Sequence, residues 1–355
     1  MNKLFKKATG FLKDGKKTVI VFDTDGDGIG AAVILAKSMK RAFNISPKAI
    51  PRDHSSSLLS KEMLSKIYGK FDLIVFLDMA VNESPDDVKK LANKSKVVII
   101  DHHNSLNDLN NENISHLNSA FWQKKISSHK YCTSKIVYDL VSSFLDVSDL
   151  DWLAGLGILN DKAEKTWEDF LNEVYAKNKM SQKQLETVNN MISSSYQFSK
   201  SKDLMVSFYA CLEAISPFDI LNARTENAKK LKSYYDVIQG EIDSIIAHWR
   251  ENAEIDEKKK FILLELNTKF SISSTISTIL SFDNPHYTVM VARKSSSGIS
   301  ISLRRQDMKV DCSKLAKKLT AGLENASGGG HVPAAGIKIM TKDWDALRKR
   351  LETSL

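Results

Sequence analysis

The sequence predicts an α/β protein, with a doubly wound parallel sheet in the first domain, a helical linker and a smaller α/β domain at the C-terminal end. Three observations support this prediction. Short apolar runs alternate with helical patterns over the first 100 residues, which is typical of parallel sheets. Residues 225–253 form a nearly continuous helical pattern, and the last third again mixes strand and helix patterns. The 355 residues are enough for two domains that each bury a core.

The expected elements follow from the apolar patterns. In the first domain we expect strands at 18–22, 73–77 and 96–100, a short strand within 46–53, and helices at 31–37, 60–68 and after Pro85. The Asn- and Asp-rich segment 104–118 is expected to be a loop. In the last third we expect strands at 261–266, 287–293 and 298–303, and helices at 274–280, 312–319 and 343–353.

Acids and histidines follow the three long apolar runs directly. These candidate ligands are Asp23, Asp25, Asp27, Asp78, Asp101, His102 and His103. Because the carboxyl ends of parallel strands meet at one edge of a sheet, we expect the side chains to gather there. Oxygen ligands mixed with imidazole suit Mn²⁺, Mg²⁺ or Zn²⁺ better than a thiolate site would. Asp23 and Asp101 could merely cap helices, and His103 could be a buried structural histidine, but acids at three strand ends favour a metal centre.

Composition narrows the classes of protein. A net charge of +8 favours an acidic partner such as nucleic acid, with a solvated basic surface as the alternative. The three cysteines are scattered and have no Cys-x-x-Cys spacing, which predicts neither disulfides nor structural zinc, and indicates a reducing, cytoplasmic location. No window has the length and apolar character of a membrane span or a signal peptide, so no membrane partner is expected.

Three motifs, in order along the chain, resemble the DHH phosphoesterase superfamily. They are Asp23-Thr24-Asp25-Gly26-Asp27, Asp101-His102-His103 and the glycine-rich segment 328–336. The chain is most similar to the branch of RecJ-like exonucleases and nanoRNases, and the resemblance covers nearly all of it. It implies a DHH catalytic domain at 1–195, a helical linker at 196–257 and a DHH-associated substrate-binding domain at 258–355.

The resemblance also implies the roles of the metal-site residues. The metal ligands would be Asp23, Asp25, Asp27, Asp78, His102 and Asp161, holding two Mn²⁺ or Mg²⁺ ions. Asp78 would bridge the ions, His103 would contact the phosphate, and Asp101 would orient a neighbour. Val21 stands where the family usually has a histidine. One metal position is therefore expected to be built differently, with Asp23 or Asp27 compensating.

A second group of residues is expected to bind substrate. Three consecutive glycines, Gly328 to Gly330, could expose backbone N–H groups to an anion, and His331 would add a donor. Arg304, at a predicted strand end, could bind phosphate with two parallel hydrogen bonds. The resemblance assigns the substrate contacts to Ser302, Arg304, Gly328, Gly329, Gly330, His331 and Ala334.

Three functions remain open at this point. The first is a metal-dependent hydrolase, a nuclease that trims single-stranded DNA or RNA, or short oligonucleotides, from an end between two lobes, with a role in DNA replication or repair. The second is a non-catalytic RecJ-like replication factor that binds a GINS-type complex, which the missing histidine at Val21 favours. The third is a phosphoesterase acting on cyclic dinucleotides or 3′,5′-bisphosphate nucleotides.

Overall fold

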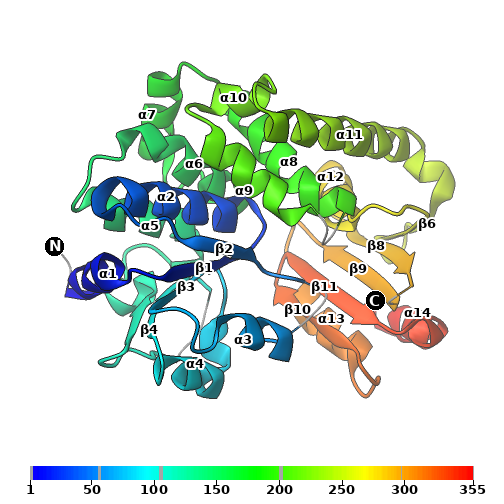
Figure 1. Cartoon of the computed structure of the whole chain (residues 1–355). Coiled ribbons are helices and arrows are strands. Elements are labelled where there is room, and N and C mark those ends of the chain that lie inside the picture. Colours follow the sequence, from blue (N-terminus) through cyan, green and yellow to red (C-terminus); the bar gives the residue numbers. More distant parts are fainter. Residues whose placement is uncertain (1–2, 55–56, 104–106, 200–202, 297, 355) are drawn as a thin grey trace. The chain divides into compact units, whose positions relative to one another are not determined.

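The computed structural model describes residues 3–54, 57–103, 107–199, 203–296 and 298–354 (Figure 1). The chain divides into two compact units, Met1–Tyr235 and Asp236–Leu355. The division falls within one long helix, α11 (Glu226–Asn252), which has the extent predicted from its pattern. Within the described ranges, no helix is both long enough and apolar enough to cross a membrane.

The N-terminal unit contains a parallel sheet of five strands in the order β2-β1-β3-β4-β5. The strands are β1 (Thr18–Phe22), β2 (Lys48–Pro51), β3 (Leu73–Leu77), β4 (Lys96–Ile100) and β5 (Ile114–Leu117). The predicted parallel sheet is thus confirmed. The prediction of a loop over 104–118 was wrong for its last part, because β5 adds an edge strand beside β4; residues 104–106 lie outside the described residues.

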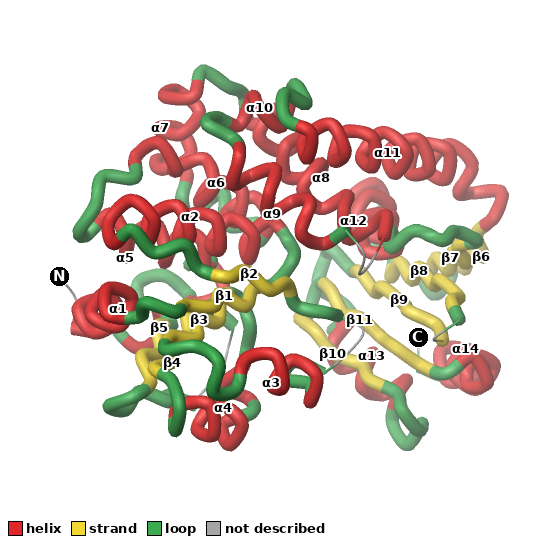
Figure 2. Tube along the Cα trace, in the orientation of Figure 1, coloured by secondary structure: helices red, strands yellow, loops and turns green. Residues whose placement is uncertain are grey.

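Helices cover both faces of this sheet, as the predicted doubly wound fold requires (Figure 2). The helices of this unit up to residue 221 are α1 (Lys3–Asp14), α2 (Gly26–Phe43), α3 (Lys61–Ile67), α4 (Pro85–Ala92), α5 (Thr133–Ser142), α6 (Asp151–Asn160), α7 (Glu168–Asn178), α8 (Gln182–Ser199), α9 (Leu204–Glu213) and α10 (Pro217–Leu221), with 3₁₀ turns at Val81–Glu83, Ser119–Phe121, Ser128–Lys130 and Ser148–Leu150. Side chains on β1 alternate between the two cores. Ile20 and Phe22 pack with α2, α5 and α6, whereas Val19 and Val21 pack with α3 and α4.

The C-terminal unit contains a mixed sheet of six strands in the order β10-β11-β9-β8-β7-β6. The strands are β6 (Ala253–Asp256), β7 (Phe261–Leu266), β8 (Thr288–Ser295), β9 (Gly298–Arg304), β10 (Ser327–His331) and β11 (Ala334–Ile339); the helices are α12 (Ser273–Asp283), α13 (Cys312–Thr320) and α14 (Trp344–Glu352), with a 3₁₀ turn at Thr341–Asp343. Among the described residues of this sheet, β7 and β8 pair in parallel and the other neighbouring strands pair antiparallel. One face packs its apolar residues against α13 and α14, and α12 packs against β8 and β9.

Candidate metal centre

The carboxyl ends of the central strands place three acids at the same level of the sheet. The strands are paired so that their last residues lie opposite one another. The pairing continues one residue further, because the amides of Asp23, Asp78 and Asp101 each donate to the last carbonyl of the neighbouring strand, at 3.2, 3.0 and 3.0 Å. The backbone ladder therefore fixes the spacing of these acids.

Two further acids belong to the start of α2. Asp25 is its N-cap, and one carboxylate oxygen accepts hydrogen bonds from the amides of Asp27 and Gly28, at 3.1 and 3.0 Å. The Asp27 carboxylate accepts from the first two amides of α5, those of Thr133 and Ser134, at 2.7 and 2.8 Å. The helix cap is therefore Asp25 and not Asp23, which the structural alternative had named, and Asp25 and Asp27 both also face the cluster.

Two overlapping groups of ligand atoms form there. Among the described residues, Asp78, His102 and His103 form one group, and Asp27, His102 and Asp161 form another, with ligand atoms within 4.8 Å of one another in each. His102 belongs to both groups, and its Nε2 lies 3.4 Å from Asp78 Oδ1 and 3.4 Å from Asp161 Oδ2. Acids from β1–α2, β3 and α6 thus surround one imidazole.

Burial and mutual repulsion make this cluster of acids unfavourable without a cation. Burial raises the pKa of Asp78 and that of Asp161 well above the usual range, and the nearby Asp27 and Asp25 carboxylates raise them further. Burial also raises the pKa of Asp25 to about 6, with Asp23 and Asp27 adding to the shift. Asp161 Oδ2 is buried and has no hydrogen-bond partner among the described residues. A hard divalent cation such as Mn²⁺ or Mg²⁺ fits this set of donors, because it would neutralise the excess negative charge.

His103 differs from His102 in exposure and charge. Its Nδ1 lies 2.7 Å from Asp101 Oδ1, and its side chain is 49% exposed whereas that of Asp101 is fully buried. Burial lowers the pKa of His103, but hydrogen bonding and attraction to Asp101 outweigh this effect and raise it to about 9. Asp101 therefore holds an imidazolium at the surface of the cluster, where it could donate to an anion.

Asp23 already has two basic neighbours, Arg52 and His54, that the sequence did not reveal. Its Oδ2 lies 2.9 Å from an Arg52 guanidinium nitrogen and its Oδ1 lies 2.9 Å from His54 Nε2. Burial raises the pKa of Asp23, but His54 and Arg52 outweigh it and hold that pKa below its usual range. Val21 is buried in the apolar core instead.

The sequence did not indicate several hydrogen bonds to the proposed metal ligands. Asn160 Nδ2 donates to Asp25 Oδ2 at 2.9 Å and to Asp161 Oδ1 at 3.2 Å. These hydrogen bonds link the start of α2 to the end of α6. The Thr133 hydroxyl donates to Asp78 Oδ1 at 3.2 Å. The strand-end argument, extended to β2, would have found Arg52, whose amide donates to the Phe22 carbonyl at 2.8 Å. No sequence signal singled out Thr133.

In the C-terminal unit, the three consecutive glycines Gly328 to Gly330 belong to strand β10, which pairs with β11. Amides along a strand point alternately to opposite sides, so Gly328, Gly329 and Gly330 cannot all donate to one anion, and that expectation was wrong. A Cβ on Gly328 would lie 2.5 Å from the Ala316 carbonyl oxygen, which shows how closely α13 approaches this strand.

The remaining predicted substrate contacts lie on the other face of this sheet. Residues that are paired across β9, β11 and β10 form two neighbouring rows on this face. The rows are Arg304–Ala334–His331 and Ser302–Gly336–Gly329. The second row has no bulky side chain, and a Cβ added at Gly329 would meet nothing within 4 Å. Arg304 is held from α12, since one guanidinium nitrogen donates to Ser274 Oγ at 2.8 Å.

Comparison with known families agrees with this geometry. Residues 17–165 match the model of the DHH family, N-terminal domain, and residues 258–355 match that of the DHHA1 domain. The chain belongs to the DHH phosphoesterase superfamily. Members of the DHH superfamily are generally metal-dependent phosphoesterases. No curated protein sequence matches this chain.

Solved structures share the fold of this DHH protein at low sequence identity. RecJ from Thermus thermophilus, in complex with Mn²⁺, is 14% identical with a TM-score of 0.74, over 99% of this chain and 54% of that chain. CDC45 from Entamoeba histolytica is 11% identical with a TM-score of 0.55, over 99% and 98%. The pGpG-specific phosphodiesterase PggH from Vibrio is 14% identical with a TM-score of 0.51, over 95% and 98%. The DHH chain thus spans about half the length of the RecJ chain.

Proposed function

We propose that this protein is a RecJ-like exonuclease, a metal-dependent phosphodiesterase that hydrolyses single-stranded DNA or RNA, or short oligonucleotides. The observation that carries the proposal is the pair of ligand groups that share His102. Such a cluster of buried acids needs a cation for stability, and two adjacent groups fit two ions. The fold shared with a Mn²⁺ complex of RecJ supports Mn²⁺, with Mg²⁺ as the alternative.

In this proposal Asp23, Asp25, Asp27, Asp78, His102 and Asp161 hold the metal. Asp78 is the proposed bridge, since its pKa responds to burial and then to Asp27, Asp25, Asp161 and Asp23 together. Bound divalent ions would lower the pKa of a water molecule and neutralise charge on the phosphoryl oxygens. His103 would donate to a phosphate oxygen, with Asp101 holding its ring and its charge. Arg52 and His54 would hold Asp23 in place until metal binds.

We assign substrate contacts to Arg304, Ser302, Gly329, His331 and Ala334, in the proposed substrate-binding domain 258–355. The open rows on β9, β11 and β10 support this assignment. Gly328 and Gly330 lie on the face toward α13, so we assign them no substrate contact. A surface without bulky side chains lets a strand backbone approach closely, and the net charge of +8 favours a polyanion.

The second candidate is a non-catalytic replication factor, which would bind a GINS-type complex. The ion pairs of Asp23 with Arg52 and His54 favour it, because they occupy one carboxylate in the absence of metal. The fold shared with CDC45 agrees with it. The raised pKa values of Asp25, Asp78 and Asp161 argue against it, since a protein that binds no metal gains nothing from burying these acids together.

The deciding experiment measures nucleotide release from labelled single strands of DNA and RNA, and from pGpG, with Mn²⁺ or Mg²⁺. We expect release with the parent protein and a loss of several orders of magnitude in Asp78→Asn, since metal catalysis contributes several kcal/mol. Asparagine suits this position because Asp78 has a φ of 59°. Asp72→Asn, at the residue before the same strand, is the matched control and should keep full activity.

No release from any substrate by folded, metal-loaded protein would refute the enzymatic proposal. Hydrolysis of pGpG without hydrolysis of longer strands would assign the site to small substrates instead.

A further inference from the structure

A second recess in the N-terminal unit lies away from the metal cluster. It has a volume of about 610 Å³ and is lined by the second half of α2, by residues 46–49 at the start of β2, and by α9. Figure 1 labels these three elements. We call it the α2–α9 groove. The side chains that characterise it are Lys37, Lys40, Arg41, Lys48, Phe208 and Tyr209.

The groove carries positive charge that carboxylates only partly balance. Four of its lining residues are basic, and none of those described is acidic. Arg41 is paired with Asp149 at 2.7 Å, but Lys40 Nζ contacts only the neutral amide oxygen of Asn44, at 2.8 Å. Lys48 is exposed and has neither a hydrogen-bond nor an ion-pair partner among the described residues. The charge therefore fits an anionic ligand.

The groove also presents an aromatic ring to solvent. Tyr209 is 46% exposed, whereas its neighbour Phe208 is only 3% exposed. The Phe208 ring packs edge-on against Tyr209, with centroids 5.6 Å apart, and also against Phe22 in the core, at 5.3 Å. Tyr209 thus rests on a fixed apolar base with part of its ring free to stack.

We propose that the α2–α9 groove binds a stretch of single-stranded nucleic acid, with phosphates beside Lys40 and Lys48 and a base stacked on Tyr209. An aromatic platform next to lysines is how proteins bind single strands without reading their sequence. The N-terminal end of α2 contributes to the metal cluster, and its C-terminal half lines the groove. Asp27 and Arg41 are therefore about 20 Å apart along the helix, at 1.5 Å per residue. A dinucleotide at the metal cluster cannot reach the groove.

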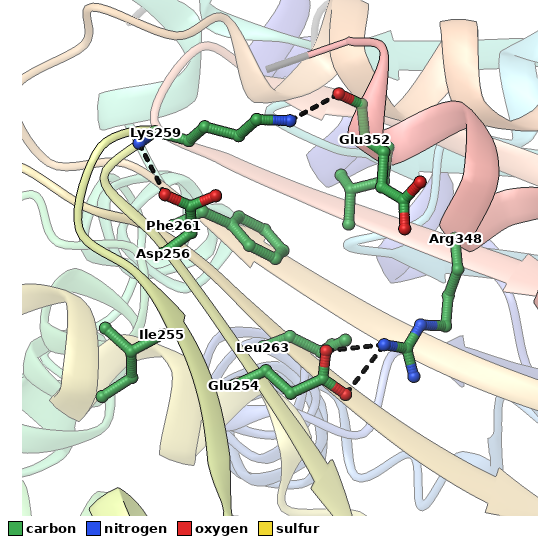
Figure 3. Close-up of a pocket in the computed structure, with 9 residues that line it drawn as sticks. Glu254, Ile255, Asp256, Lys259, Phe261, Leu263, Arg348 and Glu352 are labelled. Carbon is green, nitrogen blue, oxygen red and sulfur yellow. Dashed lines mark hydrogen bonds and ion pairs between the residues drawn. The ribbon is translucent and has the colours of Figure 1, made fainter.

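A cavity in the C-terminal unit provides a contrast. It has a volume of about 260 Å³ and lies between the β6–β7 hairpin and α14 (Figure 3). Three of its lining residues are acidic and two are basic. Arg348 pairs with Glu254 at 2.6 Å, and Lys259 Nζ donates to the backbone carbonyl of Glu352 at 2.5 Å. This cavity therefore has no excess of positive charge, and carries no proposal.

The test measures binding of a long fluorescein-labelled oligothymidylate to the full chain in EDTA, by fluorescence anisotropy over a range of salt concentrations. The variants are Lys40→Glu/Lys48→Glu, Tyr209→Ala and Tyr209→Phe. Lys13→Glu/Lys94→Glu, two exposed lysines outside the groove, is the charge-matched control. EDTA removes any dependence on catalysis. The inference rests on the proposed function only in taking single-stranded nucleic acid as the ligand, and does not require that the strand be hydrolysed.

We expect Tyr209→Ala to weaken binding about ten-fold and Tyr209→Phe to bind like the parent, because stacking needs only the ring. Lys40→Glu/Lys48→Glu should also reduce the slope of log K against log salt by about 1.4, since each lost phosphate contact contributes about 0.7 for single strands. Hydrolysis of a dinucleotide should be unchanged in all these variants.

Parent-like binding by both Lys40→Glu/Lys48→Glu and Tyr209→Ala would overturn the proposal, and so would an equal loss of binding in the control. Competition by thymidine monophosphate as effective as by the strand would assign the groove to free nucleotides and overturn it too. Strand binding that depends on the groove, in a protein that hydrolyses nothing, would support this inference while refuting the proposed function.

Discussion

Replacement of Gly157 by alanine should disturb the metal cluster without touching any of its proposed ligands. Gly157 lies in α6, and a Cβ there would sit 2.1 Å from Asp27 Oδ1 and 2.1 Å from Ser134 Oγ. Real Cβ atoms do not approach so closely, so the Asp27 carboxylate must move. It is held by the amides of Thr133 and Ser134, at 2.7 and 2.8 Å, and these hydrogen bonds must lengthen as it moves.

The size of the effect follows from these contacts. Asp27 has to retreat by about 1 Å, and a misplacement of that size can cost about a hundred-fold in rate. Weakening a hydrogen bond to a charged group costs about 1.5–3 kcal/mol, which corresponds to a similar loss of Mn²⁺ affinity. At a Mn²⁺ concentration of about 100 times the parent's Kd, metal should stabilise the parent by about 2.7 kcal/mol and the variant by only about 0.4 kcal/mol.

Chemical unfolding with and without Mn²⁺ measures this stabilisation independently of catalysis. The matched control is Gly155→Ala in the same helix, whose new Cβ would meet only movable side chains, the nearest being Leu185 at 3.1 Å. The control should respond to Mn²⁺ like the parent. If Gly157→Ala did so as well, Asp27 would not be a metal ligand and the reasoning would be refuted.

Three further predictions concern other parts of the chain. Arg304→Ala should raise KM for long strands ten- to a hundred-fold, because one charge-assisted contact is worth about 1.5–3 kcal/mol, and leave Mn²⁺ affinity unchanged. Val21→His should lower the metal-free unfolding free energy by about 1–3 kcal/mol, since it places a polar ring in a packed core; Mn²⁺ should then stabilise it more than the parent. Burial lowers the pKa of His116 from 6.5 to about 4, so its stabilising contribution is complete above pH 6.5 and falls by about 3 kcal/mol towards pH 4.

Each of these has its own check. For Arg304→Ala, steady-state kinetics on long strands and on a dinucleotide are compared, and an equal rise of KM on both would contradict a role in strand binding. For Val21→His, an unchanged response to Mn²⁺ would mean that neighbouring acids complete the site. For His116, unfolding of His116→Phe is compared with the parent between pH 4 and 7. Parallel curves would show that this histidine does not titrate between the two states.

The sequence predicted the central part of the first sheet because its signal is redundant. Runs such as 73–77 and 96–100 are apolar and β-branched, and they end in acids. Strand β5 was missed because it is a four-residue edge strand set in Asn-rich sequence, where local composition favours turns. Strand β10 was missed because glycine has little strand propensity, and only pairing with β11 holds it extended.

The candidate site was predictable where a residue stands at a strand end or in a family motif. Arg52 follows β2, so the strand-end argument would have found it if it had been extended to that short strand. His54 could not be assigned, because the position of β2 beside β1 is a tertiary property. The role of Asn160 could not be predicted, because its hydrogen-bond partners Asp25 and Asp161 come together only when α6 packs against α2. The same packing explains Gly157, whose missing side chain makes room for Asp27.

The amides of Asp23, Asp78 and Asp101 form the last rung of hydrogen bonds in the parallel sheet. The distances between the proposed ligands therefore depend on whether that rung is closed, and any fraying of the strand ends spreads the carboxylates apart. Metal ions bound by these carboxylates would have the opposite effect, because they would hold the carboxyl ends of the strands together. Hydrogen exchange at these three amides should slow when Mn²⁺ binds, while exchange at the opposite ends of the same strands stays unchanged.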